Sequence, residues 1–282
     1  MSIIEEAVRK TAERYQRHAP PPDQAPGGRP RLRRVPSTPI DTSNVRRFQP
    51  VSLDHAVLEE HNVLPLVTDQ GALRAYKILR TRLLRRLEAN QWHSFAVTGA
   101  TPGEGKTVTA INLAMALAQD SNTWVFLVDL DLQRPRIADY LGLNNSRGER
   151  GLTDYLLGDA TMEQITYSPV GMDRLAIIPN FQAVANASDL LTSPRMEELV
   201  HALESEAPRR IVIFDMPPVL ASDDVLAFAP QVDGMLLVVG EGTTSRDALR
   251  GAKEMLQEMN LLGVVLNRSE AADQGAYYSY AR

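Results

Sequence analysis

The chain has 282 residues, of which 44% are hydrophobic and 23% are charged, and it contains no cysteine. This is the composition of a globular protein, and it excludes a disulfide framework and a metal site built on thiolates. No run of the sequence reaches the ~18–20 apolar residues of a membrane span, and the first twenty residues lack the apolar core of a signal peptide, so we expect a cytoplasmic protein.

Residues 1–50 differ from the rest of the chain in charge and composition. They carry ten Lys/Arg against five Asp/Glu, although the whole chain has a net charge of −5. Residues 1–18 follow a helical period and predict a short amphipathic helix, whereas residues 19–50 hold eight of the eighteen prolines and predict a disordered linker. The helix is either a docking peptide on a tether or a segment folded back on the body. The basic linker is either a solvated spacer or a contact for an anionic surface.

From residue 51 onward, short apolar runs alternate with helical patterns. The predicted strands are residues 93–98, 124–128, 175–178, 211–214, 235–239 and 263–266. The clearest helical patterns are residues 72–88, 107–119 and 246–259. Such alternation predicts an α/β fold in which helices flank a mostly parallel sheet, here as one domain over residues 51–268.

A glycine-rich loop lies between the first predicted strand and the next helix. Residues 100–107, ATPGEGKT, fit the phosphate-loop pattern with alanine in place of the first glycine. In such a loop the main-chain amides surround phosphate oxygens, Lys106 reaches the β- and γ-phosphates, and the Thr107 hydroxyl ligates Mg²⁺. The predicted nucleotide-binding residues here are Thr101, Pro102, Gly103, Glu104, Gly105, Lys106, Thr107 and Val108. The alternative is a glycine-rich turn with a chance lysine, which does not account for the flanking strand and helix.

Three aspartates follow predicted strands. Asp129 and Asp131 come after residues 124–128, and Asp215 comes after residues 211–214. Ligands of parallel sheets lie beyond the carboxyl ends of the strands, where a carboxylate needs a cation or hydrogen-bond donors. Mg²⁺ held through water by Asp215, with Asp131 nearby, would meet that need, while one aspartate could cap a helix instead.

These motifs together resemble the bacterial tyrosine kinases of capsule and exopolysaccharide export, which are MinD/ParA-like phosphate-loop NTPases. The resemblance covers about residues 70–282 and rests on ATPGEGKT, VDLDLQRP, IVIFDMPPVL, DGMLLVV and GVVLNR. The segment NASDLL is similar to the family's NP-x-E-L-L without its proline. Partition ATPases of the same class have a second lysine where this chain has Thr101, and they remain the alternative, together with a catalytically inactive nucleotide-binding adaptor.

The resemblance implies an enzyme that uses ATP and Mg²⁺ to phosphorylate protein tyrosines. The implied catalytic residues are Lys106, Asp129, Asp131 and Asp215, and the implied metal residues are Thr107, Asp131 and Asp215. The resemblance favours Asp129 as the proton acceptor, whereas the spacing leaves the choice between Asp129 and Asp131 open. Arg134 could contact phosphate or pair with Asp131. Asn267 resembles the family's base-contacting asparagine, with a turn residue as the alternative, and Arg268 follows it in the nucleotide site.

Residues 269–282, SEAADQGAYYSYAR, hold three of the eight tyrosines in the chain. Fully extended, they would span up to roughly 45–50 Å, enough to reach a neighbouring subunit. The resemblance implies that Tyr277, Tyr278 and Tyr280 are phosphoacceptors in trans. The alternative is a segment that packs as a strand at an interface.

The resemblance also implies partners. It implies a membrane polysaccharide co-polymerase, or chain-length regulator, that activates the kinase and holds it at the inner membrane, and a cognate tyrosine phosphatase. No nucleic acid is expected. The family assembles rings through Glu-x-x-Arg-x-x-Arg in the helix at residues 72–88, whereas this chain has Arg74, Lys77 and Arg80 at these positions. Self-association is therefore expected, but with an altered motif.

Overall fold

The structure is a computed structural model that describes residues 48–64, 70–120, 122–143, 148–185, 187–205 and 209–269. The predicted helix at residues 1–18, the linker up to residue 47 and the three tyrosines of the C-terminal segment lie outside these stretches. None of the helices in the described stretches is long and apolar enough to cross a membrane.

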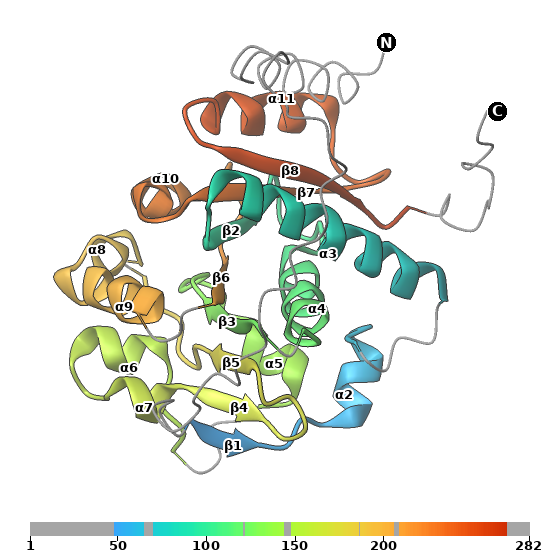
Figure 1. The fold of residues 1–282 in the computed structure, drawn as a ribbon. Coiled ribbons are helices and arrows are strands. Elements are labelled where there is room, and N and C mark those ends of the chain that lie inside the picture. The colour runs from blue at the N-terminus through green and yellow to red at the C-terminus, as the bar shows by residue number, and fades with distance from the viewer. Residues whose placement is uncertain are drawn as a thin grey trace, which may run out of the picture. The chain divides into compact units, whose positions relative to one another are not determined.

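An eight-stranded sheet runs through the molecule in the order β1-β4-β5-β3-β6-β2-β7-β8 (Figure 1). The strands are β1 (Gln49–Val51), β2 (Ser94–Gly99), β3 (Trp124–Asp129), β4 (Tyr167–Pro169), β5 (Leu175–Ile178), β6 (Arg210–Asp215), β7 (Gly234–Gly240) and β8 (Leu261–Asn267). All neighbouring strands are parallel except β4 and β5. The predicted α/β class and mostly parallel sheet are therefore confirmed, and the six predicted strands form its β2, β3, β5, β6, β7 and β8.

Helices cover both faces of the sheet. They are α2 (His55–Glu60), α3 (Gln70–Asn90), α4 (Lys106–Ala118), α5 (Ile137–Leu141), α6 (Leu152–Leu157), α7 (Met162–Ile165), α8 (Ala187–Leu191), α9 (Pro194–Ser205), α10 (Asp224–Phe228) and α11 (Arg246–Met255), with a 3₁₀ turn η3 (Ala229–Gln231). Helices α2 to α5 pack on one face, and α6 to α11 pack on the other (Figure 1).

The alternation of side chains along each strand divides the interior into two cores. In β3, Val125 and Leu127 pack under α2 to α5, whereas Phe126 and Val128 pack under α6 to α11. Because both faces are covered, strands β2, β3 and β7 are buried along their whole length. This explains why they read in the sequence as continuous apolar runs rather than as alternating ones.

Helix α3 lies across α4 and packs on it. Leu83 and Leu87 are buried against α4 and the sheet, as the helical period of residues 72–88 predicts. Of the three basic residues in the altered motif, Arg74 and Lys77 are exposed. Arg80 instead donates a hydrogen bond to the carbonyl of Ala116 near the end of α4 (3.1 Å). The three side chains therefore do not form one free basic face.

Candidate active site

The phosphate loop joins the carboxyl end of β2 to the first turn of α4, as predicted. Gly103 and Gly105 both have φ +86°, a left-handed conformation that favours glycine over residues with a Cβ. Helix α4 starts at Lys106, and its N-cap, Gly105, has no side chain with which to cap the first turn. The amides of that turn are therefore left for an anionic ligand, and the helix dipole favours one there.

Lys106 lies between Asp131, two residues after the end of β3, and Asp215, the last residue of the neighbouring strand β6. Its Nζ is 2.7 Å from Asp131 Oδ2 and 4.0 Å from Asp215 Oδ1, and the side chains of these three residues are only 12%, 7% and 0% exposed. Burial lowers the pKa of Lys106, but the negative charges of Asp215 and Asp131 outweigh this effect and raise the pKa above its ordinary value. The site therefore holds a fixed ammonium charge at the mouth of the loop.

Asp215, at the end of β6, has two buried carboxylate oxygens without a hydrogen bond of normal geometry. Burial raises its pKa to about 6, against the opposing effects of the Lys106 ammonium and the Thr107 hydroxyl. A buried carboxylate without donors is costly. Mg²⁺ with its water shell, next to the Thr107 hydroxyl, would supply the missing partners, so the residues present fit this ion.

Asp129, at the end of β3, has two oxygens in different environments. Its Oδ2 accepts hydrogen bonds from the main-chain N–H groups of Arg136 (3.0 Å) and Ile137 (2.9 Å) at the start of α5. Its Oδ1 is buried and has no hydrogen-bond partner. Burial, and then the negative charge of Asp215, raises the pKa of Asp129 well above its ordinary value. The helix-capping alternative thus holds for one oxygen, and the other is left able to accept a proton.

Both carboxylate oxygens of Asp131 accept hydrogen bonds. Its Oδ2 faces Lys106, and its Oδ1 accepts a hydrogen bond from the main-chain N–H of Arg134 (3.1 Å). The Arg134 side chain is exposed, so its link to Asp131 is through the main chain. The neighbouring Gln133 donates from Nε2 to Asp224 Oδ2 (3.0 Å) and thereby ties this loop to the segment that follows β6. No local sequence pattern predicts the contact between Gln133 and Asp224, because it joins residues 91 positions apart.

The side chain of Glu104 is buried, whereas the sequence pattern predicts this residue only as a member of the phosphate loop. Its Oε1 accepts hydrogen bonds from the hydroxyls of Thr101 (2.9 Å) and Thr244 (2.5 Å). A Cβ at Gly99 would lie 2.3 Å from Glu104 Oε2, so the carboxylate is accommodated only because residue 99 is glycine. Any contact of Glu104 with a nucleotide is therefore through its main chain, while its side chain links the phosphate loop to the loop after β7.

Asn267 connects the same loop to the end of β8. Its Nδ2 donates to the carbonyl of Glu104 (2.9 Å), and a Cβ at Gly105 would lie 2.1 Å from this nitrogen. The next residue, Arg268, has φ +60°, which is uncommon for a residue other than glycine. Asn267 is thus the last residue of a strand that packs on the phosphate loop, and Arg268 makes the turn.

Replacing Glu104 with alanine should weaken ATP binding by about tenfold or more, because the partly buried hydroxyls of Thr101 and Thr244 would lose their acceptor, at a cost of ~1–3 kcal/mol. Glu104→Gln should retain most of the affinity, since an amide oxygen can still accept. The measurement is the Kd for ATP together with the melting temperature. The control is Glu241→Ala, which removes an exposed carboxylate from the loop that contains Thr244. Equal affinities for Glu104→Ala and Glu241→Ala would contradict the role of the Glu104 contacts.

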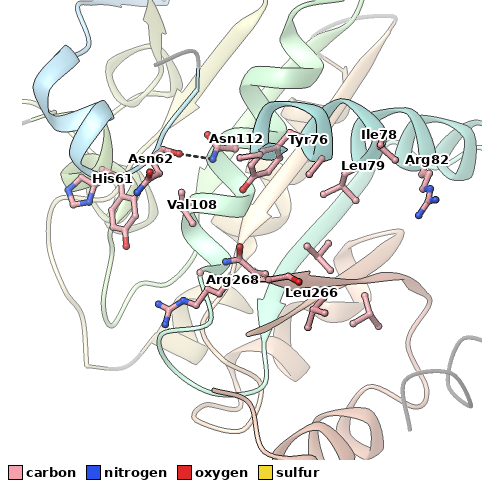
Figure 2. Close-up of a pocket in the computed structure, with 18 of the residues that line it drawn as sticks. His61, Asn62, Tyr76, Ile78, Leu79, Arg82, Val108, Asn112, Leu266 and Arg268 are labelled. Carbon is pink, nitrogen blue, oxygen red and sulfur yellow. Dashed lines mark hydrogen bonds between the residues drawn. The ribbon is translucent and has the colours of Figure 1, made fainter. Parts of the chain in front are cut away.

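A groove of about 890 Å³ opens beside the phosphate loop and runs along α3 (Figure 2). We call it the α3 groove. Its inner end is lined by Gly105, Val108 and Asn267, which belong to the predicted nucleotide site. Its outer end is lined by α3 and β8, including Ile78, Arg82 and Val264 to Leu266, and Arg268 and Ser269 follow Asn267 along the same groove. Figure 2 shows Tyr76, Leu79 and Arg82 projecting from α3 on one side, with Leu266 on β8 and Arg268 just after β8 on the other.

The structure thus brings Lys106, Thr107, Asp129, Asp131 and Asp215 together at the carboxyl ends of β2, β3 and β6. Asn267 and Arg268 lie at the end of β8, where they line the groove beside Gly105 and Val108. Tyr277, Tyr278 and Tyr280 lie outside the described residues, so their position relative to this site stays a prediction.

Known proteins resemble this chain both in sequence and in structure. The profile of the AAA domain family matches residues 94–269. The tyrosine-protein kinase YwqD of Bacillus subtilis (strain 168) is 34% identical over 225 residues, which cover 78% of this chain and 92% of that protein. The putative tyrosine-protein kinase EpsB of Ralstonia nicotianae is 32% identical over 76% of this chain, which spans only 28% of that longer protein. Among solved structures, the kinase domain of the Escherichia coli tyrosine kinase ETK superposes with a TM-score of 0.64 at 25% identity, over 84% of this chain and 95% of that one.

Proposed function

Because the chain belongs to the family of bacterial tyrosine-protein kinases, with the MinD/ParA-like phosphate-loop fold, we propose that it transfers the γ-phosphoryl group of ATP to Tyr277, Tyr278 and Tyr280 of another copy of itself. The observation that carries the proposal is the cluster of Lys106, Asp131 and Asp215 at the mouth of the phosphate loop. It combines one fixed positive charge with the two buried oxygens of Asp215, which have no hydrogen bond of normal geometry.

The residues of the loop would bind and orient ATP. The main-chain amides of the first turn of α4 and the Lys106 ammonium would hold the β- and γ-phosphates, with Lys106 exchanging part of its contact with Asp131 for phosphate oxygens. When bound, Mg²⁺ would neutralise phosphate charge, and Thr107, Asp131 and Asp215 are the residues that would hold it. Asn267 and Val108 line the inner end of the α3 groove, where the adenine would lie.

The transfer step needs a proton acceptor, because a tyrosine hydroxyl has an ordinary pKa of about 10. The tyrosine oxygen bonds to the γ-phosphorus while the bond from that phosphorus to the bridging oxygen of ADP breaks. The tyrosine proton passes to the free Oδ1 of Asp129, and ADP leaves. The raised pKa of Asp129 favours this role, since a carboxylate with a higher pKa is a better proton acceptor once it is ionised.

The position of Thr101 supports a kinase over a partition ATPase. Partition ATPases place a lysine here, whereas the Thr101 hydroxyl is used within the chain as a donor to Glu104. This position therefore offers no charge to a nucleotide in a facing subunit. No contact in the described part of the chain specifically favours the alternative function.

We further propose that the kinase acts in capsule or exopolysaccharide production, at the inner face of the membrane, through a membrane co-polymerase that activates it and a phosphatase that resets it. Its similarity to the kinases above supports this setting. Self-association through α3 would use Arg74 and Lys77, because Arg80 is bound to Ala116 within the chain.

Incubation of the pure chain with Mg-ATP tests the proposal, with phosphate mapped by mass spectrometry. We expect phosphotyrosine at positions 277, 278 and 280 and little elsewhere. ATP hydrolysis without any phosphotyrosine would instead favour a partition-type ATPase, and nucleotide binding without either reaction would favour an inactive adaptor.

A further inference from the structure

The outer end of the α3 groove has uncovered apolar walls. Ile78 on α3 is 36% exposed, and Leu266 on β8, which lines the same groove, is 47% exposed. These are two of only a few large apolar side chains that are this exposed in the described part of the chain. An apolar wall of this kind suits an aromatic ring, which buries a large area on contact.

Helix α3, which forms one wall of this groove, is strongly basic. Within α3, the Lys/Arg residues are Arg74, Lys77, Arg80, Arg82, Arg85 and Arg86, and Glu88 is the one acidic residue. All of these basic side chains except Arg80 are exposed, and none of them forms an ion pair with a described carboxylate. Arg82 lines the groove itself, and Arg85 lies less than one turn further along the helix. In a chain with a net charge of −5, this concentration of positive charge favours an anionic occupant.

The C-terminal segment leaves the described structure at this same groove. Ser269, the last described residue, lines it. Tyr277 is eight residues further along the chain, which corresponds to a reach of up to about 26–29 Å. The nine-residue interval from Tyr76 to Arg85 along α3 spans only about 14 Å. The segment is therefore long enough to turn at the small and polar residues 270–276 and return to α3 of its own chain.

From these features we infer that residues 270–282, once phosphorylated, dock in the outer end of the α3 groove of the same chain. The tyrosine rings pack against Ile78 and Leu266, and the phosphates bind the guanidinium groups of Arg82 and Arg85. Arginine suits this role because its planar group donates two hydrogen bonds to one phosphate. The inference rests on the proposed function, since it assumes that these tyrosines acquire phosphate.

Docking of this kind would make phosphorylation change the site to which the C-terminal segment binds. An unmodified segment carries only Glu270 and Asp273 as acidic residues and one arginine, whereas each phosphate adds about −1.5 to −2 charges. Phosphorylation would thus move the segment from a neighbour's active site to its own α3. There it would cover Arg82 and Arg85 and stay out of reach of a second transfer.

A synthetic peptide of residues 270–282 with phosphotyrosine at all three positions provides the first arm of the test. It is titrated into the full chain with Tyr277, Tyr278 and Tyr280 replaced by phenylalanine, without nucleotide, and binding is followed by fluorescence polarisation. We expect the unphosphorylated peptide to bind at least about tenfold more weakly, and Arg82→Gln with Arg85→Gln to cause a similar loss. The matched control is Arg246→Gln with Lys253→Gln, which removes the same charge from exposed positions on α11.

Equal binding by the Arg82/Arg85 and Arg246/Lys253 double variants, or no binding of the phosphopeptide at all, would overturn the inference. Because the peptide carries its phosphate by synthesis, this arm gives an answer even if the chain does not phosphorylate itself. Conversely, phosphotyrosine on the full chain without peptide binding would leave the proposed function standing and remove only the docking site.

The second arm measures how fast a tyrosine phosphatase removes phosphate from the phosphorylated full chain. We expect removal to be several-fold faster with Arg82→Gln and Arg85→Gln than with the α11 control, because an undocked segment is more accessible. The protection should be the same at all protein concentrations. Protection that increases with concentration would contradict docking within one chain and indicate docking on a second copy.

Discussion

Replacing Lys106 with methionine should lower autophosphorylation by at least about a hundredfold to a thousandfold, the usual effect of removing one fixed charge that stabilises a transition state. Lys106 is the basic side chain that the structure places within 4.0 Å of both Asp131 and Asp215. Without it, no ammonium would face the transferring phosphoryl group. The measurement is the rate of phosphotyrosine formation at saturating ATP, with ATP binding determined separately.

The methionine variant also leaves two buried carboxylates without their shared cation, so its folding must be checked by circular dichroism and thermal melting. Lys106→Arg keeps the positive charge and should fold like the parent, yet still transfer slowly because a guanidinium cannot replace a compact ammonium in the loop. Lys253→Met, at an exposed position on α11, is the matched control. Transfer by Lys106→Arg and Lys106→Met at the rate of Lys253→Met would refute the assignment of the phosphate loop.

The second large effect is expected when the three tyrosines proposed to accept phosphate are removed. A chain in which Tyr277, Tyr278 and Tyr280 are all phenylalanine should incorporate little phosphate and still bind ATP with the parent's affinity. The reason is that the residues proposed to bind ATP all come before position 269 in the chain, whereas the three tyrosines come after it. Tyr140→Phe is the control, because this tyrosine stacks on His61 in the folded body and should not accept phosphate.

Mixing the two defective chains separates transfer between copies from transfer within one copy. Lys106→Met has acceptors but no activity, and the triple phenylalanine chain has activity but no acceptors. Phosphate should appear on the Lys106→Met chain at a rate proportional to the concentration of the triple phenylalanine chain. Full incorporation by the triple phenylalanine chain alone would reject the C-terminal tyrosines as acceptors, and an unlabelled mixture of two folded chains would reject transfer in trans.

Local sequence patterns predicted the strands that carry the site. The loop glycines, Lys106 and the aspartates at the ends of β3 and β6 could be located because each follows a buried strand, and such strands are visible as apolar runs. The strands β1 and β4 were not predicted, because each has only three residues and their pairing joins Gln49 to Tyr167, which are far apart in the sequence. Helix α11 ends at Met255, four residues before the predicted end, although the apolar period continues through the following turn.

The contacts that refine the site depend on residues distant in sequence. The spacing of Asp129 could not decide whether it caps a helix or faces the ligand. In the structure, its Oδ2 accepts hydrogen bonds from the start of α5, whereas its Oδ1 has no hydrogen-bond partner. Likewise, the inward orientation of Glu104 depends on the lack of a side chain at Gly99 and on Thr244, 140 residues away. Such arrangements follow from how the sheet brings strand ends together, which no local pattern encodes.

The contacts of Glu104 make the effects of substitutions at neighbouring positions of this site depend on one another. Through its carboxylate and its carbonyl, this one residue joins the loop after β2 to the loop after β7 and to the end of β8, with Thr244 and Asn267 as partners. Residues that share a partner do not act independently, so a loss at one of them alters what the others contribute. A second substitution in a loop that is already loosened therefore costs less than the same substitution in the parent. Variation at positions 104, 244 and 267 is thus constrained as a unit, and a tolerated change at one of them depends on which residues occupy the other two.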